Sequence, residues 1–142
     1  MAKVSDLLSG KGSQVHAIGP DEPVLAAIQM MADKSVGALL VLREGALAGI
    51  VSERDYARKV ILRGRSSAET AVWEIMSSPV TTVSPGDSVA TCMMVMTERK
   101  IRHLPVLDGG KVIGVLSIGD LVKSVIEEQQ QEIAQLQRYI VS

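Results

Sequence analysis

The stretch Gly49-Ile-Val-Ser-Glu-Arg-Asp55 decides the architecture of this chain, because a similar stretch, Gly114-Val-Leu-Ser-Ile-Gly-Asp120, occurs 65 positions later. Each follows a short apolar run and has the form Gly-apolar-apolar-Ser-x-x-Asp. A serine with an acidic residue three positions on is typical of the first turn of a helix. The chain is therefore expected to contain one strand-to-helix junction twice.

The similarity extends well beyond these two stretches. Residues 18–61 align with residues 83–126 without a gap, and twelve positions are identical. Upstream, after a three-residue shift, Val4-Ser-Asp-Leu-Leu-Ser matches Val72-Trp-Glu-Ile-Met-Ser. Agreement of this extent favours duplication of one supersecondary unit.

Both repeats predict the same order of elements. A short extended stretch that ends in a proline is followed by a helix with apolar residues at i, i+3, i+4 and i+7. Two apolar runs separated by a glycine-containing turn then predict a hairpin, and a second helix follows the serine. The expected helix faces are 24–31 and 89–96, and the expected strands are 38–42, 47–51, 104–107 and 112–116.

These elements predict an α/β protein of the α+β kind. Two β-α-β-β-α units of this size cannot each bury a core alone, so we expect them to pack as a pseudo-two-fold pair, sheet against sheet. The expected domains are 4–66 and 67–126, with the polar stretch 63–70 as linker and an extended amphipathic helix over 127–142.

The C-terminal helix carries a regular apolar stripe. Ile126, Ile133 and Ile140 are spaced by seven, with Leu136 at an intermediate position. The stripe fits a helix that packs on its own domain, and it also fits a helix that pairs with another subunit. Three turns of such a seam are too few for an independent coiled coil.

The composition excludes several classes of protein. With 46% hydrophobic and 22% charged residues, the 142-residue chain is typical of a globular domain. A net charge of -1 and an aromatic content of 2% argue against nucleic-acid binding. One cysteine excludes an intrachain disulfide and fits a reducing compartment. Because neither a membrane-spanning run nor a signal peptide is evident, we expect a cytoplasmic protein.

The repeated Ser-x-x-Asp pattern has two interpretations. Backbone N–H groups and a hydroxyl at a helix N-terminus can bind an anion, and the aspartate could accept hydrogen bonds from a ribose diol. Gly49 and Gly114 would then let a ligand approach the backbone. Alternatively, the pattern is a capping box, in which serine and acid satisfy only the helix's own amides. A carboxylate cannot both cap fully and hold a diol.

No residues in the sequence suggest catalysis. The two histidines and one cysteine are far apart and lack the spacing of metal ligands. Nothing supplies an activated nucleophile or a base beside a metal. We therefore expect no enzymatic activity, no metal and no catalytic cofactor.

The two Gly-to-Asp stretches, each behind a hairpin, closely resemble the signature of CBS domains, and so does the run Arg102-His-Leu-Pro-Val-Leu-Asp108. Two CBS domains in tandem form a Bateman module. The resemblance spans about 4–126. The stretch 52–59, together with the long C-terminal helix, is similar to stand-alone bacterial CBS-pair proteins.

The resemblance implies two clefts between the repeats that bind adenine-containing ligands such as AMP, ADP, ATP, S-adenosylmethionine or NAD(H). In the first cleft, Asp55 would hold the ribose, and Ser52 and Arg54 would lie near the phosphate. Val80 and Thr81 would lie beside the base. Arg102 and His103 of the second repeat would also reach the phosphate.

The second implied cleft lacks matching cations. It would use Asp120 for ribose, Ser117 near the phosphate, and Val15 with His16 beside the base. The counterparts of Arg54, Arg102 and His103 are Gly119, Gly37 and Ala38, which carry no charge. We therefore expect the two clefts to differ in affinity or in ligand.

The family resemblance implies a non-catalytic sensor that signals nucleotide occupancy to an unknown protein effector. Such pairs commonly dimerise, and a two-fold homodimer is the default arrangement for a homo-oligomer. The alternative is a structural dimerisation or interaction module with vestigial clefts.

Overall fold

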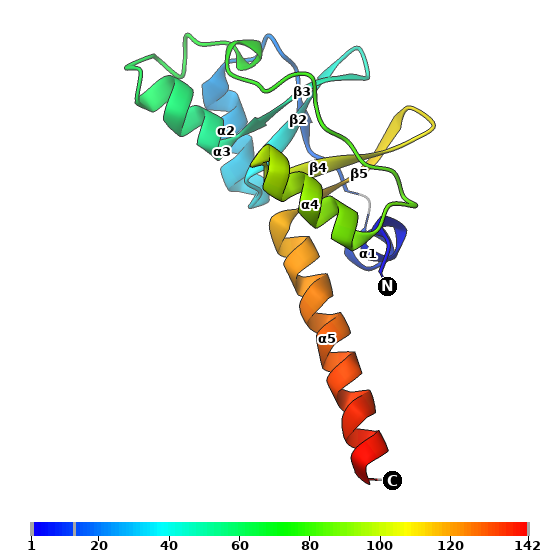
Figure 1. Ribbon diagram of the computed structural model, residues 1–142. Coiled ribbons are helices and arrows are strands. Elements are labelled where there is room, and N and C mark those ends of the chain that lie inside the picture. Colours follow the sequence, from blue (N-terminus) through cyan, green and yellow to red (C-terminus); the bar gives the residue numbers. More distant parts are fainter. Residues whose placement is uncertain (1, 13, 142) are drawn as a thin grey trace. The chain divides into compact units, whose positions relative to one another are not determined.

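The structure is a computed structural model that describes residues 2–12 and 14–141, and the chain divides into two compact units (Figure 1). The first-repeat unit is Val15–Thr81. The second-repeat unit comprises Met1–Gln14 and Thr82–Ser142, of which positions 1, 13 and 142 lie outside the described residues. Each unit combines helices with a small sheet, which confirms the mixed α/β fold class.

The first-repeat unit contains a three-stranded sheet. Strand β1 (Ala17–Ile18) pairs in parallel with β2 (Ala38–Arg43), which pairs antiparallel with β3 (Ala46–Ser52). Helix α2 (Val24–Lys34) presents Val24, Ala27 and Met31 to the core, as the helical spacing predicts. The remaining helices are α3 (Glu53–Tyr56), the π-helical turn η1 (Ala57–Ile61) that continues it, and the 3-10 helix η2 (Val72–Glu74).

The second-repeat unit repeats this order with one difference in the sheet. Its elements are α1 (Val4–Lys11), α4 (Val89–Arg99), β4 (His103–Asp108), β5 (Lys111–Ser117) and α5 (Ile118–Val141). Strands β4 and β5 form the expected hairpin, but the counterpart of β1 is a single bridge between Val83 and Val106.

Proline chemistry explains the shorter pairing. In the first-repeat unit, the Leu40 N–H donates to the His16 carbonyl at 3.1 Å. Pro105 stands at the position equivalent to Leu40 and has no N–H to donate. Val83 retains its bonds to β4, donating to the Pro105 carbonyl at 3.0 Å and accepting from Leu107 at 2.9 Å.

The upstream segments of the two repeats are exchanged between the units. The Val72 N–H donates to the Glu22 carbonyl of the first repeat at 2.8 Å, whereas the Val4 N–H donates to the Asp87 carbonyl of the second repeat at 2.9 Å. Val4 and Val72 are both fully buried. The segment of Val4 precedes the first repeat along the chain but completes the core of the second. The segment of Val72 precedes the second repeat but completes the core of the first.

This exchange bears on the expected division of the chain. The domains 4–66 and 67–126 follow the order of the repeats along the chain, whereas the compact units have other boundaries. The division into these two domains remains a prediction. The stretch 63–70 is more than a linker. The Thr70 carbonyl accepts the Val24 N–H at 2.8 Å, and Ser67 accepts the Leu25 N–H at 3.0 Å, so the stretch satisfies amides at the start of α2.

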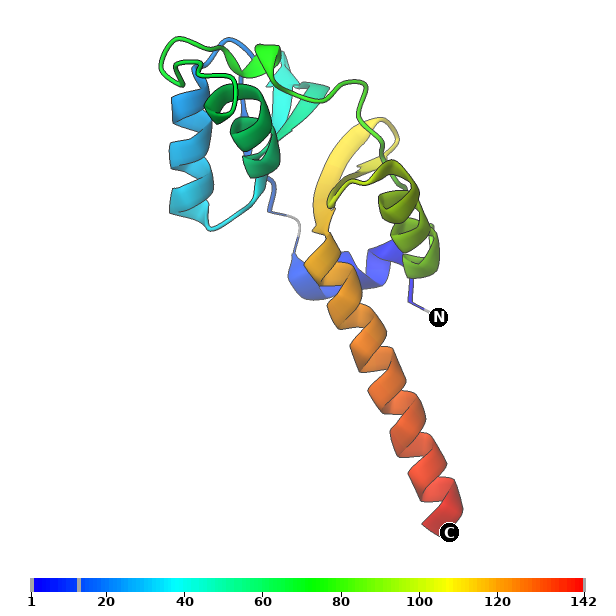
Figure 2. The same cartoon turned by 60° about the vertical axis from the view of Figure 1, so that its left-hand side comes forward.

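The C-terminal helix does not begin at residue 127. The helix that follows Ser117 and the expected helix 127–142 are one continuous helix, α5, up to Val141, and Ser142 lies outside the described residues. Leu121 in its first turns is fully buried. Beyond those turns α5 projects from the body of its unit (Figure 2).

Candidate functional site

Both Ser-x-x-Asp sequences form capping boxes. In the first repeat, Ser52 N–H donates to Asp55 Oδ2 at 3.0 Å, and Asp55 N–H donates to Ser52 Oγ at 3.2 Å. In the second, Ser117 N–H donates to Asp120 Oδ2 at 2.8 Å, and Asp120 N–H donates to Ser117 Oγ at 3.2 Å. The structure therefore realises the capping geometry at both junctions, and in each case Oδ2 makes the cap.

Each of these aspartates also meets a lysine. In the first-repeat unit, Lys59 Nζ lies 3.2 Å from Asp55 Oδ1 and donates to the Ile75 carbonyl at 2.9 Å. The Asp55 side chain is 15% exposed. Lys59 thus connects the capping aspartate to the segment that packs beside β3.

The corresponding lysine in the second-repeat unit comes from the other end of the chain. Lys11 Nζ, at the end of α1, donates to Asp120 Oδ2 at 2.5 Å and to the Val115 carbonyl at 2.7 Å. The Asp120 side chain is 26% exposed. Neither of these two lysine–aspartate contacts was predicted from the sequence. The i,i+4 spacing from Asp55 could have indicated Lys59, whereas a contact across 109 positions gives no local signal for Lys11.

The charge on Asp120 is stabilised within its unit. Burial raises the pKa of this carboxyl, but hydrogen bonds from Lys11 and from the Ser117 backbone outweigh burial and hold the pKa below its ordinary value of 3.8. The folded unit therefore favours the ionised aspartate more than the unfolded chain does.

A pH dependence of stability follows from this lowered pKa. Because the folded-state pKa lies below the unfolded value, the stabilisation is complete above about pH 4 and is lost as the pH falls through the folded pKa. We expect Lys11→Met to reduce the loss of stability on acidification. Urea unfolding of both proteins between pH 6 and pH 3 measures this. Identical slopes would contradict the role of Lys11, and Lys3→Met, which changes another lysine of the same segment, is the matched control.

The helix N-termini offer fewer amides to an anion than the sequence suggested. The Glu53 N–H donates to the Gly37 carbonyl at 3.1 Å, and the Ile118 N–H donates to the Arg102 carbonyl at 2.9 Å. With the aspartate amides bonded to the cap serines, two amides in each first turn have partners within the unit. A bound phosphate would therefore depend mainly on side chains.

Side chains of the protein itself pack closely against the two signature glycines, Gly49 and Gly114. A Cβ at Gly49 would lie 2.5 Å from Met76 Sδ and 3.0 Å from the Ser77 carbonyl oxygen, and a Cβ at Gly114 would lie 2.6 Å from Leu8 Cδ2. Met76 and Leu8 are equivalent residues of the two exchanged segments. The expectation that these glycines let a ligand approach is therefore corrected, because the exchanged segments fill the space.

Alanine substitutions at the two glycines should reduce the stability of the protein by different amounts. Gly49→Ala is expected to destabilise the protein by about 1–3 kcal/mol, because the Ser77 backbone, which pairs with β3, cannot easily retreat. Gly114→Ala should cost less, since it meets only the flexible end of Leu8. Chemical denaturation of both variants measures the difference. Equal losses would show that the backbone contact is unimportant.

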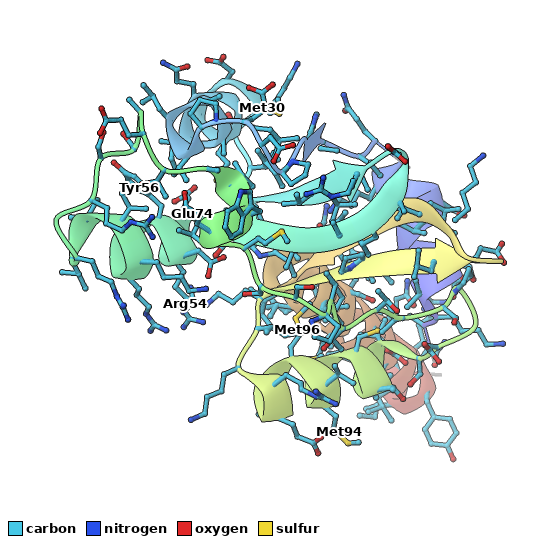
Figure 3. All side chains as sticks on the ribbon, turned by 90° about the horizontal axis from the view of Figure 1, so that it is seen from above. Met30, Arg54, Tyr56, Glu74, Met94 and Met96 are labelled. Atoms are coloured by element: carbon cyan, nitrogen blue, oxygen red, sulfur yellow. The ribbon has the colours of Figure 1, made fainter. Side chains whose placement is uncertain are left out.

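The remaining predicted residues fall in both units. Val15, His16, Val80 and Thr81 are half-buried and belong to the first-repeat unit, and so does Arg54, which is exposed on α3 (Figure 3). The His16 carbonyl is engaged by β2, as described above.

The arginine–histidine pair lies in the second-repeat unit. Arg102 is exposed and precedes β4, and His103 stands opposite Ser117 in the β4–β5 register. The structure thus brings His103, Ser117 and Asp120 to one end of one hairpin. The assignment of Arg102 and His103 to the cleft of Asp55 stays a prediction.

Two further observations concern the described part of the chain alone. Residues 2–12 and 14–141 contain no group of three or more His, Cys, Asp or Glu side chains that could hold a metal ion. None of the helices within these ranges combines the length and apolar character needed to span a bilayer.

Two β-α-β-β-α units, each with a capped strand-to-helix junction and an exchanged upstream segment, define a duplicated α/β module. The model of the CBS domain family matches residues 4–62 and 72–127, and the chain belongs to this family as a tandem pair of CBS domains.

Known proteins agree with this assignment. A CBS-domain protein of known structure from Burkholderia ambifaria MC40-6 is 51% identical, with a TM-score of 0.87 over 90% of this chain and 96% of that chain. The Arabidopsis thaliana protein "CBS domain-containing protein CBSX3, mitochondrial" is 40% identical over 96% of this chain and 71% of its own length.

A more distant structure has the same fold. The CBS domain pair of protein MJ0100, in complex with 5′-methylthioadenosine and S-adenosyl-L-methionine, is 21% identical, with a TM-score of 0.80 over 90% of this chain and 98% of that chain.

Proposed function

We propose that this chain is a non-catalytic sensor that binds an adenine nucleotide, AMP, ADP, ATP or NAD(H), at two sites of its CBS pair. The observation that carries this proposal is the pair of equivalent junctions in which Asp55 and Asp120 hold a partly exposed carboxylate. The crystallised complex of the MJ0100 CBS pair with two adenosine compounds supports an adenine-containing ligand. The proposed function requires no catalytic cofactor.

The proposed binding mode leaves the caps in place. Oδ2 of each aspartate continues to accept the serine N–H, and Oδ1 is offered to the ribose hydroxyls. At Asp55 the diol would compete with Lys59, which occupies Oδ1. At Asp120 the lysine contacts Oδ2, so a diol could approach Oδ1 without displacing Lys11.

The two sites are proposed to differ in their need for phosphate. Arg54, Arg102 and His103 would place polar or cationic groups near the phosphate of the first site, with Ser52 beside them. The second site has Ser117 and no cation at the equivalent positions. Charge-assisted hydrogen bonds to phosphate are the stronger class, so the first site should favour phosphorylated ligands over adenosine.

The base would lie beside Val80 and Thr81 at the first site and beside Val15 and His16 at the second. The His16 carbonyl already accepts a hydrogen bond from β2. Thr81 is equivalent to His16, and Pro105, which is equivalent to Leu40, has no N–H to donate to the Thr81 carbonyl. The Thr81 carbonyl is therefore the better acceptor for an adenine amino group.

The proposal includes a homodimer in the cytoplasm that signals occupancy to a separate protein effector, without a role for nucleic acid or membrane. A sensor transmits only the difference in ligand affinity between its conformations. The effector should therefore bind the free and nucleotide-bound forms with different affinities.

The capping boxes of Asp55 and Asp120 also favour a second function, that of a purely structural module. Both aspartates are occupied by serine amides and lysines, as a purely structural module with vestigial clefts would require. Native mass spectrometry of freshly purified protein, followed by calorimetric titration with AMP, ATP and NAD, separates the two functions. The sensor predicts saturable binding to two unequal sites. Absence of binding and of any thermal shift would favour the structural module.

A further inference from the structure

Helix α5 carries an apolar face that is largely exposed among the residues that the structure describes. Ile126 is 48% exposed, Ile133 54% and Ile140 79%, although isoleucine is normally a core residue. Leu121 is fully buried, and Ile118 and Val125 pack against the core of the second-repeat unit, whereas these three isoleucines are not among the residues of that core. In proteins most of the stability of a helix comes from packing of its apolar face, which favours a packing partner for this part of α5.

The exposed face has the repeat of a coiled-coil seam. Its residues recur every three or four positions, as the a and d positions of heptads do, and charged side chains lie off this line. We define the α5 seam as Val122, Ile126, Gln129, Ile133, Leu136 and Ile140.

One polar residue within the seam indicates what covers it. Gln129 occupies a d position and is exposed. In a parallel pair of identical helices in register, Gln129 meets its own copy, and each amide can both donate and accept. In an antiparallel pair or against an apolar partner, the amide would be buried without such a match, which is costly.

The residues beside the seam agree with the same arrangement. In a parallel pair each g position faces the e position five residues later on the partner. This places Glu132 opposite Gln137 and Val125 opposite Gln130, and no like charges meet. An antiparallel pair centred on the helix would instead bring the two copies of Glu132 close together.

We propose that the α5 seam binds the α5 seam of a second copy of this chain, in parallel and in register. The inference deepens the proposed homodimer, and it does not depend on nucleotide binding. It also decides between the two interpretations of the C-terminal stripe in favour of pairing between subunits.

Cysteine cross-linking of the full chain tests both pairing and orientation. Gln129→Cys and Leu136→Cys are made separately, since the native Cys92 is buried. A parallel in-register pair brings each new thiol to its own copy, so both variants should form disulfide-linked dimers upon mild oxidation. Gln131→Cys, on the opposite face, is the matched control and should remain largely unlinked.

The possible outcomes are distinct. Cross-linking at only one seam position would indicate an antiparallel pair and would overturn the proposal, as would equal cross-linking at residue 131. Ile133→Asp should raise the dimer dissociation constant at least 10-fold by sedimentation, whereas Gln131→Asp should not. Nucleotide titration of Ile133→Asp provides a separate readout, because loss of seam pairing alone leaves the nucleotide sites of each chain intact.

Discussion

Asp55→Asn is expected to weaken nucleotide binding at the first site by roughly 10-fold or more, following the 1.5–3 kcal/mol typical of hydrogen bonds to a charged group. Asparagine keeps one acceptor for the Ser52 N–H, so the cap largely persists. The negative charge and second acceptor, which the two ribose hydroxyls need, are lost. The melting temperature without ligand should therefore stay close to that of the unsubstituted protein, whereas a residue that only caps the helix would cost a few tenths of a kcal/mol to about 1 kcal/mol.

The measurement is calorimetric titration of AMP, ATP and NAD, alongside melting curves without ligand. Asp120→Asn should affect the second site in the same way and leave the first unchanged. Lys59→Met is the matched control, because it frees Oδ1 of Asp55 without altering the carboxylate. Unchanged affinities in both asparagine variants, together with lowered stability, would reduce the aspartates to helix caps and would remove the main support for the sensor.

Val4→Asp is expected to unfold the second-repeat unit selectively. Val4 is fully buried in the core that contains Leu104 and Leu116, and an unpaired carboxylate there costs several kcal/mol. By hydrogen exchange, protection of β4 and β5 should fall by about 100-fold or more, corresponding to about 3 kcal/mol. Val72→Asp, at the equivalent position, should instead deprotect β2 and β3.

This pair of variants tests the exchange of segments directly. The order of the chain alone would assign Val4 to the first repeat and Val72 to the second. Should Val4→Asp deprotect β2 and β3 while sparing β4 and β5, the exchange would be wrong. Lys3→Asp introduces the same charge at an exposed neighbouring position and should leave both hairpins protected.

Part of the candidate site could be predicted because it depends on local geometry. Ser52 and Asp55 are three residues apart, and a capping box involves only the backbone between them. The same holds for Ser117 and Asp120. The lysine at Asp120 could not be predicted, because it arrives from α1 through a contact that only the folded chain creates.

The role of the signature glycines shows the same limit. A glycine at a strand position indicates that something approaches the backbone closely, but not what approaches. At Gly49 it is Met76, and at Gly114 it is Leu8, each from an exchanged segment. The sequence indicated the close approach, and the identity of the neighbour required the tertiary structure.

The amino-acid sequence by itself determined the duplication, the order of helices and strands and the hairpins, because helical and strand periodicity and turn chemistry act over a few residues. It offered the caps as one of two interpretations. Tertiary structure decided which upstream segment completes which core, where Lys11 is bonded, and that α5 runs unbroken from Ile118 to Val141. The first two of these features depend on contacts between parts of the chain that are distant in sequence. The segments that begin at Val4 and Val72 are similar in sequence and both bury their valine, so their local sequence does not indicate which core each completes.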